Sequence, residues 1–174
     1  MYLKEFLERE KAKPLGKKEV LAMSYKKGLK SMDYEDLAGK SLSTLLPNGT
    51  GILILFTDHS HPKKPIGHFC LLYKVKNQIV FFDPLGLGLR NVTQATHSRK
   101  HLQRLLQGHD FHNNKVKYQA QQDDIQSCGR HCATRWNCSH LSPKRYQMLL
   151  HSKQLNPDDI VTLMTMDQDL TKLT

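Results

Sequence analysis

The sequence predicts an α+β protein in which helical segments flank a central group of β-strands. Continuous apolar runs bounded by turn residues, which are typical of strands, lie between residues 51 and 82. The segments on both sides, residues 1–45 and 128–174, carry apolar residues at helical spacing instead. A chain of 174 residues has the length of one domain with its own hydrophobic core, so residues 1–174 are expected to form a single domain.

Residues 1–45 are predicted to be a helical N-terminal extension. Two groups of apolar residues at helical spacing lie on either side of a break at Pro14 and Gly16: Leu3, Phe6 and Leu7 before it, and Val20, Leu21 and Tyr25 after it. Asp33, with Asp36 three residues later, resembles the start of another helix. A turn at residues 47–49 ends this region.

The central strands are predicted, in order, over residues 51–56, 68–75 and 78–82. The first is apolar throughout, which is typical of a strand buried on both faces, and a polar loop over residues 57–65 follows it. Lys76-Asn77 joins the other two into a hairpin. Asp83 precedes a proline, which favours an extended backbone and ends the last strand there.

The second half of the chain is predicted to be mainly helical. An amphipathic helix is expected over residues 92–107 and a short strand over residues 116–120. The pattern is helical again from Cys128. Pro143 and Pro157 are expected to open the helices of the C-terminal segment, residues 142–174, because proline suits the first position of a helix.

Composition predicts the location of the protein and gives less information about its binding partners. No apolar run approaches the roughly 20 residues that cross a bilayer, and the N-terminus lacks the apolar core of a signal peptide. We therefore expect a monomer inside the cell or the virion that is neither secreted nor bound to a membrane. The formal charge of +10 is typical of a solubilising surface or of nonspecific attraction to polyanions such as DNA, and no nucleic-acid-binding motif accompanies it.

Cys128 is the candidate nucleophile. Ser127 is a suitable N-cap, and a helical apolar face follows, so Cys128 is expected in the first turn of a buried helix. Unpaired amides and the helix dipole at that position stabilise a thiolate and lower the thiol pKa. Gly129 would allow another segment or a substrate to approach closely.

His68 and Asp83 are the candidate base and its orienting carboxylate. An antiparallel hairpin brings the start of its first strand beside the end of its second, so the two side chains are expected to be neighbours. Gln122, six residues before Cys128, is the candidate side-chain donor to an oxyanion, together with the backbone N–H of Cys128. Gln121 is the alternative donor.

Three motifs in this order resemble the adenain-like and SUMO-protease-like (clan CE) cysteine proteases. They are Gly67-His68-Phe69, Phe82-Asp83-Pro84-Leu85-Gly86, and Gln122 followed after five residues by Cys128-Gly129. The resemblance covers residues 51–138, the expected catalytic core. It implies a Cys–His–Asp triad of Cys128, His68 and Asp83 with Gln122 in the oxyanion hole, on a fold whose central helix carries the nucleophile and packs on a mixed β-sheet.

The same resemblance implies a function. The superfamily includes the maturation proteases of adenoviruses, large DNA viruses, virophages and Maverick-type elements, so the expected activity is cleavage of capsid or scaffold precursors at Gly-containing sites through a thioester. No cofactor is required, and DNA or a peptide would act as a stimulator. Phe69 stands where the superfamily commonly has Trp, and the spacing to Cys128 is six residues from Gln122 but seven from Gln121.

Three alternatives remain open at this point. A cellular-type SUMO or ubiquitin-like isopeptidase would share the same catalytic residues. A zinc module could use Cys128, Cys132, Cys138 and His140, although a second pair of ligands is lacking. The third alternative is a non-enzymatic, basic nucleic-acid-binding protein, which the net charge alone supports.

Overall fold

The protein has an α+β fold built on a mixed β-sheet, as the sequence predicts. The computed structural model describes residues 2–58, 60, 66–122 and 124–170. Within these residues the sheet has five strands in the order β1-β2-β3-β4-β5. Their bounds are β1 (Leu29–Asp33), β2 (Gly51–Asp58), β3 (Ile66–Val75), β4 (Gln78–Phe82) and β5 (Phe111–Asn113). The central strands β2, β3 and β4 are antiparallel, whereas β1 and β5 run parallel to their neighbours at the two edges.

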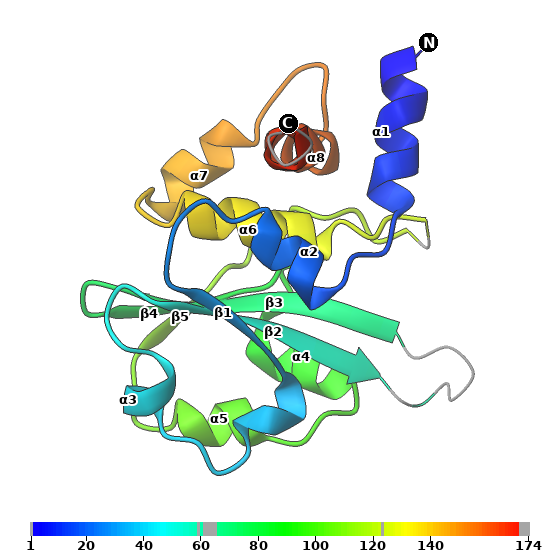
Figure 1. The fold of residues 1–174 in the computed structure, drawn as a ribbon. Helices are drawn as coiled ribbons and strands as arrows, with labels where there is room; N and C mark the ends of the chain where they lie inside the picture. The colour runs from blue at the N-terminus through cyan, green and yellow to red at the C-terminus, as the bar shows by residue number, and fades with distance from the viewer. Residues whose placement is uncertain (1, 59, 61–65, 123, 171–174) are drawn as a thin grey trace.

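Helices cover both faces of this sheet (Figure 1). On one face lie α1 (Tyr2–Ala12), α2 (Lys17–Ala22), α6 (Cys128–Asn137), α7 (Pro143–Leu149) and α8 (Pro157–Leu170). On the other lie the 3₁₀ helix η1 (Tyr34–Leu37), α3 (Leu42–Leu45), α4 (Gly88–Ala95) and α5 (His101–Leu105). As predicted, α7 and α8 begin at prolines. No helix in the described part of the chain has the length and apolarity needed to cross a bilayer.

The sheet separates two hydrophobic clusters because successive strand residues point to opposite faces. Leu53 and Leu71 join the cluster beneath α6, whereas Ile52 and Leu72 join the cluster beneath α4 and α5. β2 is therefore buried on both faces, which explains its uninterrupted apolar sequence.

The predicted hairpin of β3 and β4 forms. Val75 pairs with Gln78 and Leu71 with Phe82, so Lys76-Asn77 is a two-residue turn. Lys76 has a φ of 55°, in the left-handed region that such tight turns use. β4 ends opposite Leu71, so β3 continues past it toward Ile66.

Three expectations for the first half of the chain are wrong. Residues 29–33 are not helical: they form β1, which pairs along the edge of β2 from Leu29↔Gly51 to Asp33↔Leu55. The expected helix start at Asp33 is confirmed, because η1 follows it directly, but the Asp33 side chain does not cap η1 and instead pairs with Lys17 Nζ at 2.6 Å. The polar loop is also shorter than predicted, because β2 extends to Asp58; residues 59 and 61–65 lie outside the described residues.

Two expectations between residues 92 and 120 are also wrong. The predicted helix over residues 92–107 is two helices, α4 and α5, with His97 between them at a φ of +53°. Residues 116–120 are not a strand; the strand here is β5, which precedes them. The backbone N–H groups of Tyr118 and Gln119 both donate to the carbonyl of Pro84, so this segment is tied to the turn after β4.

Candidate active site

Cys128 is the first residue of α6, as predicted, and α6 packs against β3. All ten residues of α6 are buried, and Cys128 is 6% exposed. The expectation that Ser127 caps α6 through its side chain is wrong. The Ser127 hydroxyl instead donates to the carboxylate of Asp158 on α8, so the residue before Cys128 is held from outside the helix.

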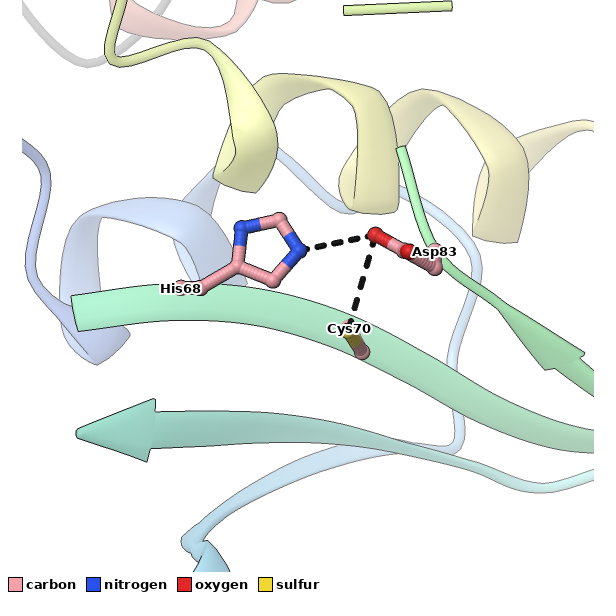
Figure 2. Close-up of side chains that lie close together, drawn as sticks. All are labelled: His68, Cys70 and Asp83. Atoms are coloured by element: carbon pink, nitrogen blue, oxygen red, sulfur yellow. Dashed lines mark hydrogen bonds and ion pairs between the residues drawn. The ribbon is translucent and has the colours of Figure 1, made fainter. Parts of the chain in front are cut away.

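His68 and Asp83 are direct neighbours, which confirms the prediction from hairpin topology. His68 Nε2 lies 2.7 Å from Asp83 Oδ1 (Figure 2). Asp83 is fully buried, and its two carboxylate oxygens also accept backbone N–H groups, Oδ1 from Leu85 at 3.0 Å and Oδ2 from Leu87 at 2.8 Å. The imidazole and these two N–H groups offset the free-energy cost of burying the Asp83 carboxylate.

The turn after β4 gives Asp83 its position. Asn114 accepts the Asp83 N–H at 2.8 Å and donates to the Asp83 carbonyl at 2.7 Å, so its side chain holds both backbone groups of that residue. Gly86 has a φ of +67°, and a Cβ there would lie 2.9 Å from the backbone of Val116. The Asp83-Pro84-Leu85-Gly86 motif therefore keeps the segment after β5 close to the carboxylate.

The part of β3 that extends beyond β4 contacts the first turn of α6. The Phe69 carbonyl accepts the Cys132 thiol at 3.5 Å, and the backbone N–H of Phe69 helps to lower the pKa of Cys128. His68 and Cys128 are close enough to shift each other's pKa, and Figure 2 shows the second ring nitrogen of His68 facing the first turn of α6. The structure thus brings together the three predicted triad residues from β3, the end of β4 and α6.

This arrangement lowers the pKa of the Cys128 thiol. Burial by itself raises that pKa, but the hydrogen bond and charge of His68, with the backbone N–H groups of Phe69 and Gly129, outweigh it. Burial lowers the pKa of His68, yet Cys70, Asp83 and Cys128 raise it well above its ordinary value. Both shifts favour a thiolate–imidazolium pair.

We expect the alkylation of Cys128 by iodoacetamide to show this shift. Only the thiolate reacts, so the rate should rise with pH to a midpoint below the ordinary thiol pKa of about 8.5. In His68→Ala the midpoint should move upward, because burial then acts with less opposition. Mass spectrometry of alkylated Cys128 across a pH series would measure both; an unshifted midpoint in the variant would contradict the pairing.

Gln122 lies in the loop before α6 with an exposed side chain, and so does Gln121. The Gln122 carbonyl accepts the Ile125 N–H at 3.1 Å, which turns the chain toward Cys128. Among the side-chain hydrogen bonds of the described residues, none involves either glutamine, so both amides are available to a substrate. The choice between them as oxyanion donor stays a prediction.

Gly129 is required by close packing. A Cβ at this position would lie 2.5 Å from Val20 Cγ2 and 3.3 Å from Phe69 Cδ2. Val20 is fully buried and belongs to α2, so the segment that approaches Gly129 is the N-terminal region of the same chain. One role of residues 17–22 is therefore to cover the first turn of the helix that carries Cys128.

Gly129→Ala should destabilise the fold by about 1–3 kcal/mol, the usual cost of overpacking a core. Gly16→Ala is a matched control, because its Cβ would meet only the exposed side chain of Glu19, which can move. Denaturant unfolding of the two variants would measure the difference. Equal stability of both would show that α2 does not pack on α6 in solution.

Sequence reasoning missed Asp158, which organises the site from α8. Its Oδ1 accepts the Ser127 hydroxyl and lies 2.9 Å from His131 Nε2, and its Oδ2 accepts the Ala120 N–H at 3.0 Å. One buried carboxylate thus joins the start of α6 to the segment that leads to the two glutamines. One signal in the sequence points to Asp158, namely its place in the first turn after Pro157. An acidic residue there is typical of a helix start and does not predict the contacts with α6.

Cys70 was also missed, although it lies two residues after His68 on the same strand face. Its sulfur lies 3.9 Å from Asp83 Oδ1, and burial raises the pKa of its thiol to about 12. All four cysteines are free. The zinc ligands proposed from Cys128 to His140 do not gather among the described residues, where the group with metal-ligand geometry is His68, Cys70 and Asp83.

Comparison with known proteins gives a viral relative without a described activity. No protein-family profile matches the sequence. The chain is similar to "Uncharacterized protein V9" of Sputnik virophage, with 29% identity over 119 residues, covering 59% of this chain and 68% of that protein.

Proposed function

We propose that this protein is a cysteine endopeptidase of the adenain-like and SUMO-protease-like superfamily. One observation carries the proposal: His68 lies 2.7 Å from the Asp83 carboxylate through Nε2, and the same imidazole lowers the pKa of Cys128. An imidazole held in this way can exchange a proton with the sulfur while the carboxylate maintains its orientation and stabilises its charge. A Cys-bearing helix packed on a mixed sheet supports the same superfamily.

In the proposed reaction the Cys128 thiolate attacks the scissile carbonyl carbon, and the π electrons of the carbonyl move onto its oxygen. The Cys128 N–H and the Gln122 side-chain amide stabilise this oxyanion. As the C–N bond breaks, the His68 imidazolium gives its proton to the leaving amine, and the acyl group remains on sulfur as a thioester. His68 then takes a proton from water, which hydrolyses the thioester and releases the Cys128 sulfur.

The proposed substrates are viral capsid or scaffold precursors cut at Gly-containing sites. Cys128 is 6% exposed and the His68 side chain 13%, so access to the sulfur is narrow and favours a residue without a Cβ. The virophage relative supports a viral origin over a cellular isopeptidase. The charge of +10 supports stimulation by DNA, with no cofactor required for the chemistry.

Co-expression with candidate precursor proteins tests the proposal. Mass spectrometry of the products should find new termini at Gly-containing sites that appear with the wild-type chain and not with an inactive variant. Intact precursors after co-expression with the reduced, folded wild-type protein would count against it.

Gln122→Ala should reduce kcat by about 10²–10³, the usual effect of losing one oxyanion donor. Gln121→Ala is the matched control, because it removes the same group from the adjacent, equally exposed position. Steady-state cleavage of a peptide spanning a mapped site would compare the two. If Gln121→Ala is the more severe, the assignment of Gln122 is wrong.

A further inference from the structure

Cys70 is a buried thiol beside the His68–Asp83 pair that the proposed reaction does not use. It is fully buried, and its sulfur faces the same carboxylate oxygen that contacts His68 (Figure 2). One ligand atom each from His68, Cys70 and Asp83 lie within 4.8 Å of one another. This close grouping of imidazole, thiol and carboxylate matches the ligand types of zinc.

The distances suit a four-coordinate divalent cation after a small adjustment. Zinc binds nitrogen and oxygen at about 2.0–2.2 Å and sulfur at about 2.3 Å, so tetrahedral geometry separates N from O by about 3.4 Å and S from O by about 3.6 Å. The observed separations are 2.7 Å from His68 Nε2 to Asp83 Oδ1 and 3.9 Å from Cys70 Sγ to Asp83 Oδ1. Each atom would need to move by less than an ångström.

Charge also favours a cation here. A thiolate and a carboxylate together neutralise a divalent ion, so the occupied site would carry no net charge in a buried position. Without the ion the Cys70 thiol keeps its proton, because burial opposes ionisation. Binding would form bonds from the ion to the Cys70 sulfur, His68 Nε2 and Asp83 Oδ1, and would release to solvent the Cys70 proton and the proton that Nε2 shares with Asp83.

We propose that His68, Cys70 and Asp83 bind a thiophilic divalent cation such as Zn²⁺, with water in the fourth position, and that the bound ion keeps Cys128 unreactive. The binding depends only on the three ligands, whereas the effect on Cys128 rests on the proposed function. A neutral imidazole that binds the ion through Nε2 carries its proton on Nδ1. Nδ1 faces α6, so Cys128 would face a neutral N–H in place of an imidazolium, and the positive charge that stabilises its thiolate would be lost.

Titration of the reduced full-length protein with Cd²⁺ or Zn²⁺ tests the binding. Isothermal titration calorimetry should give one equivalent, and Cd²⁺ should produce thiolate-to-metal absorption. Cys70→Ala, and Cys70→Ser as a size-matched second variant, should weaken binding at least tenfold while circular dichroism shows an intact fold. Cys138→Ala, at the opposite end of α6, should bind like the wild type, and so should Cys128→Ala.

The outcomes separate this inference from the proposed function. Absence of binding, or binding lost in Cys128→Ala and kept in Cys70→Ala, would overturn the metal site. One equivalent of Zn²⁺ should slow Cys128 alkylation in the wild type and leave the rate unchanged in Cys70→Ala. Slower alkylation in both proteins would overturn the proposed effect of the bound ion on Cys128. If the protein binds the metal but cleaves no peptide, the proposed peptidase activity is refuted and the metal site is not.

Discussion

Replacing Cys128 with alanine should abolish peptide cleavage, with kcat falling on the order of 10⁶, as for removal of the nucleophile in other covalent hydrolases. The substitution removes one sulfur from a residue that is 6% exposed, so the free energy of unfolding should fall by only about 1 kcal/mol. Co-expression with a precursor, followed by mass spectrometry of the termini, would measure the loss. Thermal unfolding of the purified variant would confirm that the fold is intact.

Cys132→Ala is the matched control for this prediction. Cys132 lies one turn later on α6, is fully buried, and its thiol only donates to the Phe69 carbonyl. This variant should therefore cleave the precursor at the same sites as the wild type. Cleavage that persists in Cys128→Ala would show that Cys128 is not the nucleophile.

His68→Ala should be nearly as severe, with kcat reduced by about 10⁵–10⁶, because the sulfur loses both its proton acceptor and the charge that lowers its pKa. Asp83→Asn should retain more activity, about 10⁴ below the wild type, because Asp83 orients the imidazole and does not react itself. Single-turnover cleavage of a peptide substrate would rank the two variants.

His112→Ala controls for the loss of an imidazole, since His112 is an exposed residue of β5 with no side-chain hydrogen bond among the described residues. Its activity should equal that of the wild type. Equal activity in His68→Ala and His112→Ala would exclude His68 as the base, whatever its distance from Asp83.

The contact between His68 and Asp83 could be predicted from the sequence because hairpin topology is local. Two apolar strands joined by Lys76-Asn77 allow one register that buries both faces. This register ends β4 opposite Leu71, so the next residue, Asp83, lies near His68. The helix at Cys128 was predictable for a similar reason, since its apolar face repeats with helical period.

The edge strands could not be predicted because their sequences carry little strand pattern. β1 reads Leu-Lys-Ser-Met-Asp and β5 reads Phe-His-Asn, and neither alternates cleanly between apolar and polar residues. Each becomes a strand by pairing with a buried neighbour, β2 or β4. Strand formation at such positions depends on tertiary context more than on local propensity.

The sequence by itself determined the α+β class, the central hairpin and the place of Cys128 at the start of a helix, because these follow from periodicity and turns within a few residues. Only the tertiary structure decided which side chains meet around them. Asp158 reaches Ser127 across 31 residues, and Val20 meets Gly129 across more than a hundred. Such contacts depend on how helices pack over the sheet, which no local pattern specifies.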